Sequence, residues 1–93
     1  MFNKIIKGFE WDDRNINHIS KHNVTLEEAQ EIFIDNPLVR ATREHKRIAL
    51  GKTIDGRYLK VVYIKKERGI IRVITALDAS GSEKKYYKKE KGG

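Results

Sequence analysis

The sequence predicts a single α+β domain over residues 1–93, with its elements in the order β-α-α-β-β-β-α. Apolar residues recur with a helical period in the first third of the chain, and with a period of two from about residue 47 onward. Short turn signals separate the last three expected strands, and turns this short join only antiparallel neighbours. We therefore expect an antiparallel sheet that is packed by two N-terminal helices and followed by a short C-terminal helix.

The N-terminal third is expected to hold one strand and two helices. Phe2–Phe9 mixes apolar and polar residues as a short strand does, and the two aspartates that follow it can cap a helix. Asn23 can take the left-handed conformation that ends this helix. Thr25 and Glu28 form a capping box for the second helix, which stops before Pro37 because proline disfavours helical geometry in the preceding residue.

The rest of the chain is expected to hold three strands and a helix. The expected strands are Arg47–Lys52, Tyr58–Lys65 and Ile70–Leu77, joined by turns at Asp55-Gly56 and Glu67-Arg68-Gly69. Leu38–Thr42 has only a weak strand signal and is left out of the expected order. Ser80 and Glu83 form another capping box, from which a basic helix should run to about Lys89.

Strand alternation sorts the three strands into two faces. The apolar face is expected to receive the two helices, and it comprises Ile48, Leu50, Leu59, Val61, Tyr63, Ile71, Val73 and Thr75. The other face carries Arg47, Lys60 and Arg72 among small or apolar neighbours. The planar fork of arginine suits phosphate oxygens, so this face is a candidate phosphate site. An ordinary solvated face, on which Lys and Arg are common, is the alternative.

The composition restricts the classes of partner and chemistry. Lys and Arg number 20 and Asp and Glu 13, which gives a net charge of +7 and a pI near 9.7. This charge favours a polyanion or an acidic protein as the partner, although excess lysine can also serve solubility alone. The absence of cysteine excludes disulfides, thiolate catalysis and cysteine-ligated zinc. No segment resembles a secretory signal or a membrane span, and a cytoplasmic location is expected.

Two groups of side chains suit further chemistry. His18 and His22 lie four residues apart, as zinc ligands on a helix do, but nothing completes the site, so we expect no metal or other cofactor. His22 can instead act as a general base near neutral pH. Tyr86 and Tyr87 interrupt a run of lysines, and this pattern suits nucleic acid because rings stack on bases while ammonium groups follow phosphates. An amphipathic helix that buries one tyrosine explains the same pattern.

A larger set of residues resembles a known family. The segment from Lys21 to Ala29 is similar to the signature K-H-x-V-x-x-E-E-A. Outside it the matching residues are Phe9-Glu10-Trp11-Asp12, Phe33, Pro37, Arg47, Gly51, Gly56-Arg57, Arg72-Val73-Ile74-Thr75-Ala76, Glu83 and Tyr87. On these residues the chain resembles the BrnT family of type II toxins.

The resemblance implies a RelE-like fold and a toxin that cleaves mRNA and so inhibits translation. The implied partner is a BrnA-type antitoxin, a ribbon-helix-helix protein, and operator DNA is contacted only through the toxin–antitoxin complex. We expect a metal-independent endoribonuclease. In its reaction the ribose 2′-hydroxyl attacks the adjacent phosphate and leaves a 2′,3′-cyclic phosphate.

The expected site draws on residues from the whole length of the chain. Arginines would bind the phosphate, while Lys21 and His22 would transfer protons. The catalytic candidates are Lys21, His22, Arg47, Arg72, Glu83 and Tyr87, and the candidates for holding RNA are Lys60, Lys84, Lys85 and Tyr86. Leu77 stands where the resemblance implies an arginine near the scissile phosphate, which predicts weakened catalysis. The alternative function is an inactive basic module that binds the antitoxin, as a corepressor, or nucleic acid.

Overall fold

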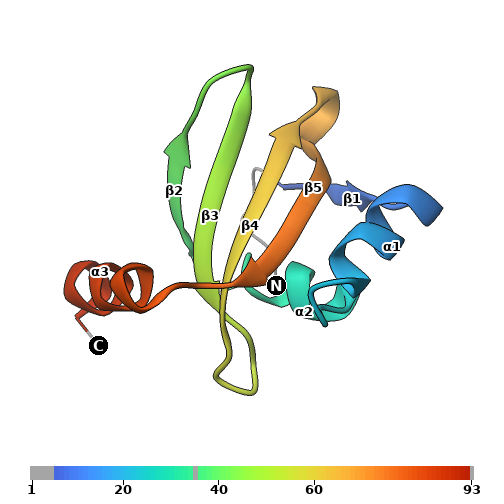
Figure 1. Cartoon of the computed structure of the whole chain (residues 1–93). Helices are drawn as coiled ribbons and strands as arrows, with labels where there is room; N and C mark the ends of the chain where they lie inside the picture. Colours follow the sequence, from blue (N-terminus) through green and yellow to red (C-terminus); the bar gives the residue numbers. More distant parts are fainter. Residues whose placement is uncertain (1–5, 35, 93) are drawn as a thin grey trace.

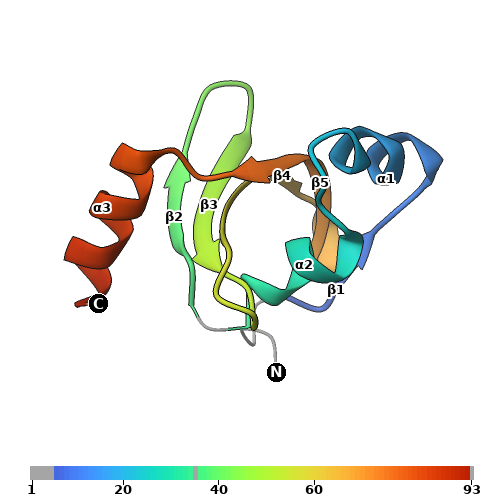
Figure 2. The ribbon, with the colours of Figure 1, turned by 60° about the horizontal axis from the view of Figure 1, so that its bottom comes forward.

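Five strands form one strongly curled sheet, with α2 in the mouth of the curl and α1 beside β5 (Figures 1 and 2). The computed structural model describes residues 6–34 and 36–92. In chain order its elements are β1 (Gly8–Glu10), α1 (Asp13–Ser20), α2 (Leu26–Glu31), β2 (Leu38–Ala41), β3 (Lys46–Lys52), β4 (Tyr58–Lys65), a 3-10 turn (Glu67–Gly69), β5 (Ile70–Asp78) and α3 (Gly81–Lys91). Among these described helices, none has the length and apolar character needed to cross a membrane.

The strands lie in the order β1-β5-β4-β3-β2. The antiparallel pairing of the last three strands is confirmed, but β1 runs parallel to β5, so the prediction of a wholly antiparallel sheet is wrong. The short-turn argument applies only to strands that follow each other, and β1 and β5 do not. The α+β class is confirmed, whereas the RelE-like topology stays a prediction.

Leu38–Ala41, which the expected order omits, forms the edge strand β2 and pairs with β3. Its sequence signal is weak because Val39–Ala41 is exposed on both faces, so burial imposes no alternation. The β2–β3 turn also lacks glycine: Glu44 and His45 adopt φ angles of 63° and 64° instead. At the other edge, β1 begins at Gly8; residues 2–5 of the predicted first strand lie outside the described residues.

The helix caps follow the sequence closely. Asp12 caps α1 by accepting a hydrogen bond from the Asn15 N–H, and Thr25 and Glu28 form the predicted capping box of α2. Asn23 adopts a φ of 59°, as expected for the residue that ends the first helical segment. The second helix ends earlier than predicted, at Glu31, and continues as a turn.

The core lies between the two N-terminal helices and the hollow side of the sheet. The helical side comprises Ile19 of α1 with Ala29, Ile32 and Phe33, and these four residues are almost fully buried. The sheet contributes Ala49, Leu59, Val61, Tyr63, Ile71, Val73 and Ala76. Phe33 packs edge-on against Tyr63, with ring centroids 5.3 Å apart. Trp11 packs at the margin of this core, and its Nε1 donates to the side-chain Oε1 of Gln30 at 2.7 Å.

The predicted faces are right for β4 and wrong for β3. Ala49 and Gly51, not Ile48 and Leu50, lie beside Val61 and Leu59 on the helix side. The reason is the closeness of α2: a Cβ on Gly51 would lie 2.7 Å from the Cβ of Ile32. Only small residues fit at that distance, so the larger pair faces outward.

A β-bulge changes the face of the second half of β5. Val62 pairs with Thr75 and Tyr63 with Val73, which leaves Ile74 as an extra residue. The bulge turns Ala76 into the core and moves Thr75 to the outer face, contrary to the prediction.

Helix α3 lies across the outer face near β3 and extends past the sheet (Figure 1). Ser80 and Glu83 form the predicted capping box, and the helix reaches Lys91, slightly beyond the predicted end. Tyr87 is buried and packs edge-on against Tyr58, with centroids 5.7 Å apart. Tyr86 is half exposed, so the pattern with one buried tyrosine is the one the helix adopts.

Replacing Gly51 with alanine should destabilise the fold by about 1–3 kcal/mol, because the new methyl group must push the backbone of α2 away. The measurement is the free energy of unfolding in urea. Gly81→Ala is the matched control, since no atom lies within 4 Å of its new Cβ. Equal stability of the two variants would contradict the tight contact between α2 and β3.

Candidate functional site

The residues predicted for catalysis do not gather at one place. Lys21 and His22 lie exposed at the corner between α1 and α2. Arg47 lies on the helix side of the sheet, directly opposite Tyr63, whereas Lys60 and Arg72 occupy the outer side. The prediction that these three cations share one face is therefore wrong, because β3 presents its small residues to α2.

Arg72 is held by carboxylates of β1 and the cap of α1. Its Nη1 lies 3.1 Å from Glu10 Oε1 and 2.9 Å from Asp12 Oδ2. Hydrogen bonds from Lys66 and Arg72 hold the pKa of Glu10 below its usual value, and Arg72 does the same for the pKa of Asp12. Much of the positive charge of Arg72 is thus compensated within the fold. Its first role in this structure is to join β1 and α1 to β5.

Asn15 strengthens the same junction from the buried side. Its amide group donates to the Glu10 carbonyl oxygen at 2.9 Å and to the Val73 carbonyl oxygen at 3.1 Å. A polar side chain that is 4% exposed needs such partners, and Asn15 has them in the parallel β1–β5 pair.

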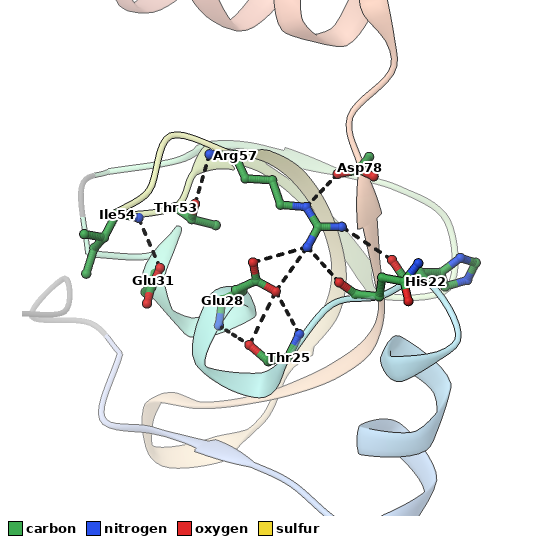
Figure 3. A network of polar contacts seen from close by, with 9 residues as sticks. His22, Thr25, Glu28, Glu31, Thr53, Ile54, Arg57 and Asp78 are labelled. Carbon is green, nitrogen blue, oxygen red and sulfur yellow. Dashed lines mark hydrogen bonds and ion pairs between the residues drawn. The ribbon is translucent and has the colours of Figure 1, made fainter.

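Arg57 lies at the centre of the polar network drawn in Figure 3. Its Nε donates to Asp78 Oδ1 at 2.7 Å, while Nη1 donates to the Asn23 carbonyl oxygen at 2.7 Å and to Glu28 Oε1 at 3.1 Å. One guanidinium thereby joins the end of β5, the α1–α2 corner and the first turn of α2. Each of these hydrogen bonds involves a charged group, so they are stronger than neutral ones.

The two carboxylates of this network have lowered pKa values. The Arg57 hydrogen bond lowers the pKa of Asp78. For Glu28 the Thr25 N–H is the main cause and Arg57 adds to it, against the opposing effect of burial. Both groups are therefore anionic at neutral pH.

The network explains much of the signature segment in structural terms. Glu28 serves at once as the capping-box residue of α2 and as the partner of Arg57. His22 takes part only through its carbonyl oxygen, 3.5 Å from Arg57 Nη2, and its ring points away from the guanidinium (Figure 3). Next along the chain, Glu31 accepts from the Ile54 N–H and holds the β3–β4 turn against α2.

The outer face of the sheet has the composition of a surface for an anionic chain. The strand pairing places its cations around a half-exposed apolar centre formed by Ile48, Val62, Ile64, Ile74 and Thr75. Lys46 and Arg72 lie at one end of this face, Lys60 at the other, and Arg40 on the edge strand. Helix α3 crosses this face at one end, and α1 reaches its margin, where Asp12 pairs with Arg72 and where Arg14 and His18 line a pocket with Ile74.

Lys60 and Glu83 are the two predicted site residues that the fold brings into contact. Lys60 Nζ lies 3.2 Å from Glu83 Oε2, and the other carboxylate oxygen of Glu83 accepts from the Ser80 N–H. Burial raises the pKa of Glu83, but the Ser80 N–H and Lys60 outweigh it and keep the group anionic. Leu77 lies directly opposite Lys60 in the β4–β5 register. An arginine at position 77 would thus stand beside this pair.

A groove of about 340 Å³ continues from this pair towards the edge of the sheet. Its walls are β2, β3 and the first turns of α3, with Tyr86 at its rim and Leu38, Ile48 and Leu50 among its apolar residues. Lys84 and Lys85 are exposed on the same helix. The predicted RNA-holding residues Lys60, Lys84, Lys85 and Tyr86 therefore come from one region, whereas Tyr87 is buried beneath it.

The histidines do not form a metal site with other residues. The rings of His18 and His22 lie 5.9 Å apart, but the described residues contain no group of three or more His, Cys, Asp or Glu side chains suited to a metal ion.

Comparison with known families decides which family these features belong to. The family model described as "Ribonuclease toxin, BrnT, of type II toxin-antitoxin system" matches residues 11–83. This chain belongs to the BrnT family. No curated protein matches it in sequence. The BrnT ribonuclease toxin of Brucella abortus, solved by crystallography at 1.1 Å, has the same fold with a TM-score of 0.66 at 21% identity, covering 78% of this chain and 96% of that one.

Family membership makes this chain a ribonuclease toxin of a type II toxin–antitoxin system, and such a toxin has an antitoxin as its partner. Sequence reasoning assigned no role to Arg57 or Arg40. Arg57 stands out in the sequence only through the Gly56-Arg57 match to the family, because its carboxylate partners lie 21 and 29 residues away in the chain. Arg40 could not be found, since its strand was left out.

Replacing Arg57 with methionine should lower the free energy of unfolding at pH 7 by about 1–3 kcal/mol, since it leaves Glu28 half-buried without its cation. The loss should shrink towards pH 3. Glu28 and Asp78 have lower pKa values in the folded than in the unfolded chain. Their ion pairs therefore stabilise the fold fully above the unfolded pKa of about 4, and this contribution is lost as the pH falls through the folded pKa.

Urea midpoints at pH 7 and pH 3 measure this difference. Arg14→Met, at an exposed position of α1, is the control and should change neither value. A stability loss of equal size at both pH values would show that Arg57 acts through packing and not through its ion pairs.

Proposed function

We propose that this BrnT protein cleaves mRNA as a metal-independent endoribonuclease and that a BrnA-type antitoxin neutralises it. In the reaction the ribose 2′-hydroxyl oxygen attacks the adjacent phosphorus in line, the P–O5′ bond breaks, and the products carry a 2′,3′-cyclic phosphate and a 5′-hydroxyl. Such cleavage inhibits translation and takes place in the cytoplasm, where mRNA is translated.

The observation that carries the proposal is the Lys60–Glu83 pair at the end of the open outer face. The face offers cations from four strands, β2 to β5, and a single strand of RNA can follow them with its phosphates. The exposed lysines of α3 and the half-exposed ring of Tyr86 extend this track. Cations that follow the phosphates, together with an exposed aromatic ring that can stack on a base, suit single-stranded nucleic acid.

The roles at the pair follow from charge. Glu83 is anionic, so it suits the removal of a proton from the 2′-hydroxyl rather than the donation of one. Lys60, released from Glu83 when RNA enters, would stabilise the negative charge that grows on the phosphate. Arg72 lies on the same face but is held by two carboxylates, so we assign it to positioning. Arg47 lies on the opposite face and leaves the catalytic set.

Leu77 limits the positive charge at this site, because an uncharged side chain occupies the position opposite Lys60. The side chain opposite Lys60 contributes no charge, so Lys60 is the main cation available to the transition state. The same observation supports a second function, a catalytically weak toxin that acts chiefly by binding its antitoxin. In that case the toxin–antitoxin complex, with a ribbon-helix-helix antitoxin, would contact operator DNA and repress its own genes.

Incubating the protein with RNA in EDTA should produce fragments with 2′,3′-cyclic phosphate ends. Lys60→Met should reduce the cleavage rate about 100-fold, the usual effect of losing one preorganised charge in a transition state. Leu77→Arg should raise the rate, because a guanidinium beside Lys60 adds a second charge at the phosphate.

Lys7→Met, an exposed lysine before β1, is the control and should cleave like the unmodified protein. Loss of cleavage in EDTA would rule out the metal-independent reaction. If RNA stays intact even with Leu77→Arg, the binding function replaces the enzymatic one.

A further inference from the structure

We propose that the outer edge of β2 receives an extended acidic segment of the partner protein as a sixth strand of the sheet. This inference rests on the proposed antitoxin partner. The backbone edge of β2 does not include the Lys60–Glu83 pair, although Glu83 lines the groove next to that edge. Figure 1 shows β2 at the end of the sheet with no further strand beside it.

The hydrogen bonding of β2 shows which of its backbone groups are available. The Thr42 N–H donates to the Lys46 carbonyl oxygen at 2.8 Å, which fixes the phase of the β2–β3 ladder. In an antiparallel pair, hydrogen-bonded and non-hydrogen-bonded pairs alternate, so Leu38 and Arg40 bond to β3. Val39 and Ala41 then direct their N–H and C=O groups outward. An added strand would find its backbone partners at these two residues.

Grooves lie on both sides of this edge, and Val39 lines both of them. On the outer face is the groove of about 340 Å³ that is bounded by α3. On the helix side is a pocket of about 210 Å³, with Tyr63 and Pro37 among its walls. Side chains of a strand alternate between its faces, so an added strand would send successive side chains into the two grooves in turn.

The two grooves differ in charge, and this difference determines the occupant. Arg47 and Lys65 both line the helix-side pocket, and neither forms an ion pair with a described residue. The groove under α3 is apolar at Leu38, Ile48 and Leu50, and its two charged residues, Arg40 and Glu83, have opposite signs. The fitting segment therefore alternates acidic residues, which face Arg47 and Lys65, with apolar residues, which face α3.

A second copy of this chain fits the edge poorly. Antiparallel pairing of β2 with itself would bring two copies of Arg40 close together, and like charges across a strand pair are destabilising. An acidic partner instead gains from the overall charge of +7. Charge complementarity thus favours a different protein over self-association.

The experiment uses the full chain, labelled for NMR, and a synthetic eight-residue peptide in which Val and Glu alternate. Binding should slow amide exchange at Val39 and Ala41 at least tenfold. The Arg40 amide is the internal control, because its ladder bond to β3 already protects it. A peptide with Lys in place of Glu should not bind.

Two variants test the backbone and the charge separately. Val39→Pro removes an outward N–H without removing a ladder bond, so it should weaken peptide binding about tenfold, while Val39→Thr keeps the donor and should bind normally. Arg47→Glu should lose the Glu peptide and bind the Lys peptide. Val39→Pro and Arg47→Glu should both cleave RNA at the unmodified rate, since neither residue belongs to the proposed catalytic pair.

Unchanged exchange at Val39 and Ala41 in saturating peptide would overturn the proposal. So would binding that is indifferent to Val39→Pro, or protection of these amides by an RNA oligonucleotide and not by the peptide. Absence of RNA cleavage in the unmodified protein would count against the proposed function alone, because peptide binding is measured without RNA.

Discussion

The close contact between α2 and β3 is the constraint on which the rest of this structure depends. Ile32 approaches Gly51 so closely that a single added methyl group has no space. Small residues of β3 must therefore face the helices, and because side chains alternate along a strand, this determines which face every other residue of β3 occupies. As a result Arg47 lies on the helix side, while Ile48 and Leu50 form part of the outer face. Both the RNA surface and the edge-strand surface proposed for this protein follow from that phase.

Ion pairing decides which of the many cations are available to a ligand. Arg57 and Arg72 are the best-connected arginines in the described part of the chain, and each joins distant segments through carboxylates. Lys60 has one exchangeable partner on a neighbouring helix, while Arg47 and Lys65 have no ion-pair partner among the described residues. Some cations of this basic chain therefore hold the fold together, and others are available to bind a ligand. The position of each cation in the sheet, and not its residue type, determines which of the two roles it has.

The residues by which the BrnT family is recognised in this sequence are largely structural. The signature glutamate Glu28 caps α2 and binds Arg57, and the helix-side Gly51 permits the α2 contact. These residues specify how the helices sit in the curl of the sheet. The proposed chemistry lies elsewhere, on the outer face and at the start of α3. The family signature in this chain thus specifies the framework, while the proposed catalytic pair lies outside the signature segment.

The sequence by itself determined the local structure: the caps at Asp12, Thr25 and Ser80, the antiparallel β3–β4–β5 meander, and the single buried tyrosine of α3. These features depend on neighbours a few residues away. It also assigned Lys60, Lys84, Lys85 and Tyr86 to holding RNA; that role stays a prediction, and only the fold places these four residues in one region. Tertiary structure alone decided the parallel β1–β5 pair, the edge strand β2, the bulge at Ile74 and the face of Arg47. Each of these follows from contacts between segments far apart in the chain, above all the space left between Ile32 and Gly51, and no local pattern of residues records that distance.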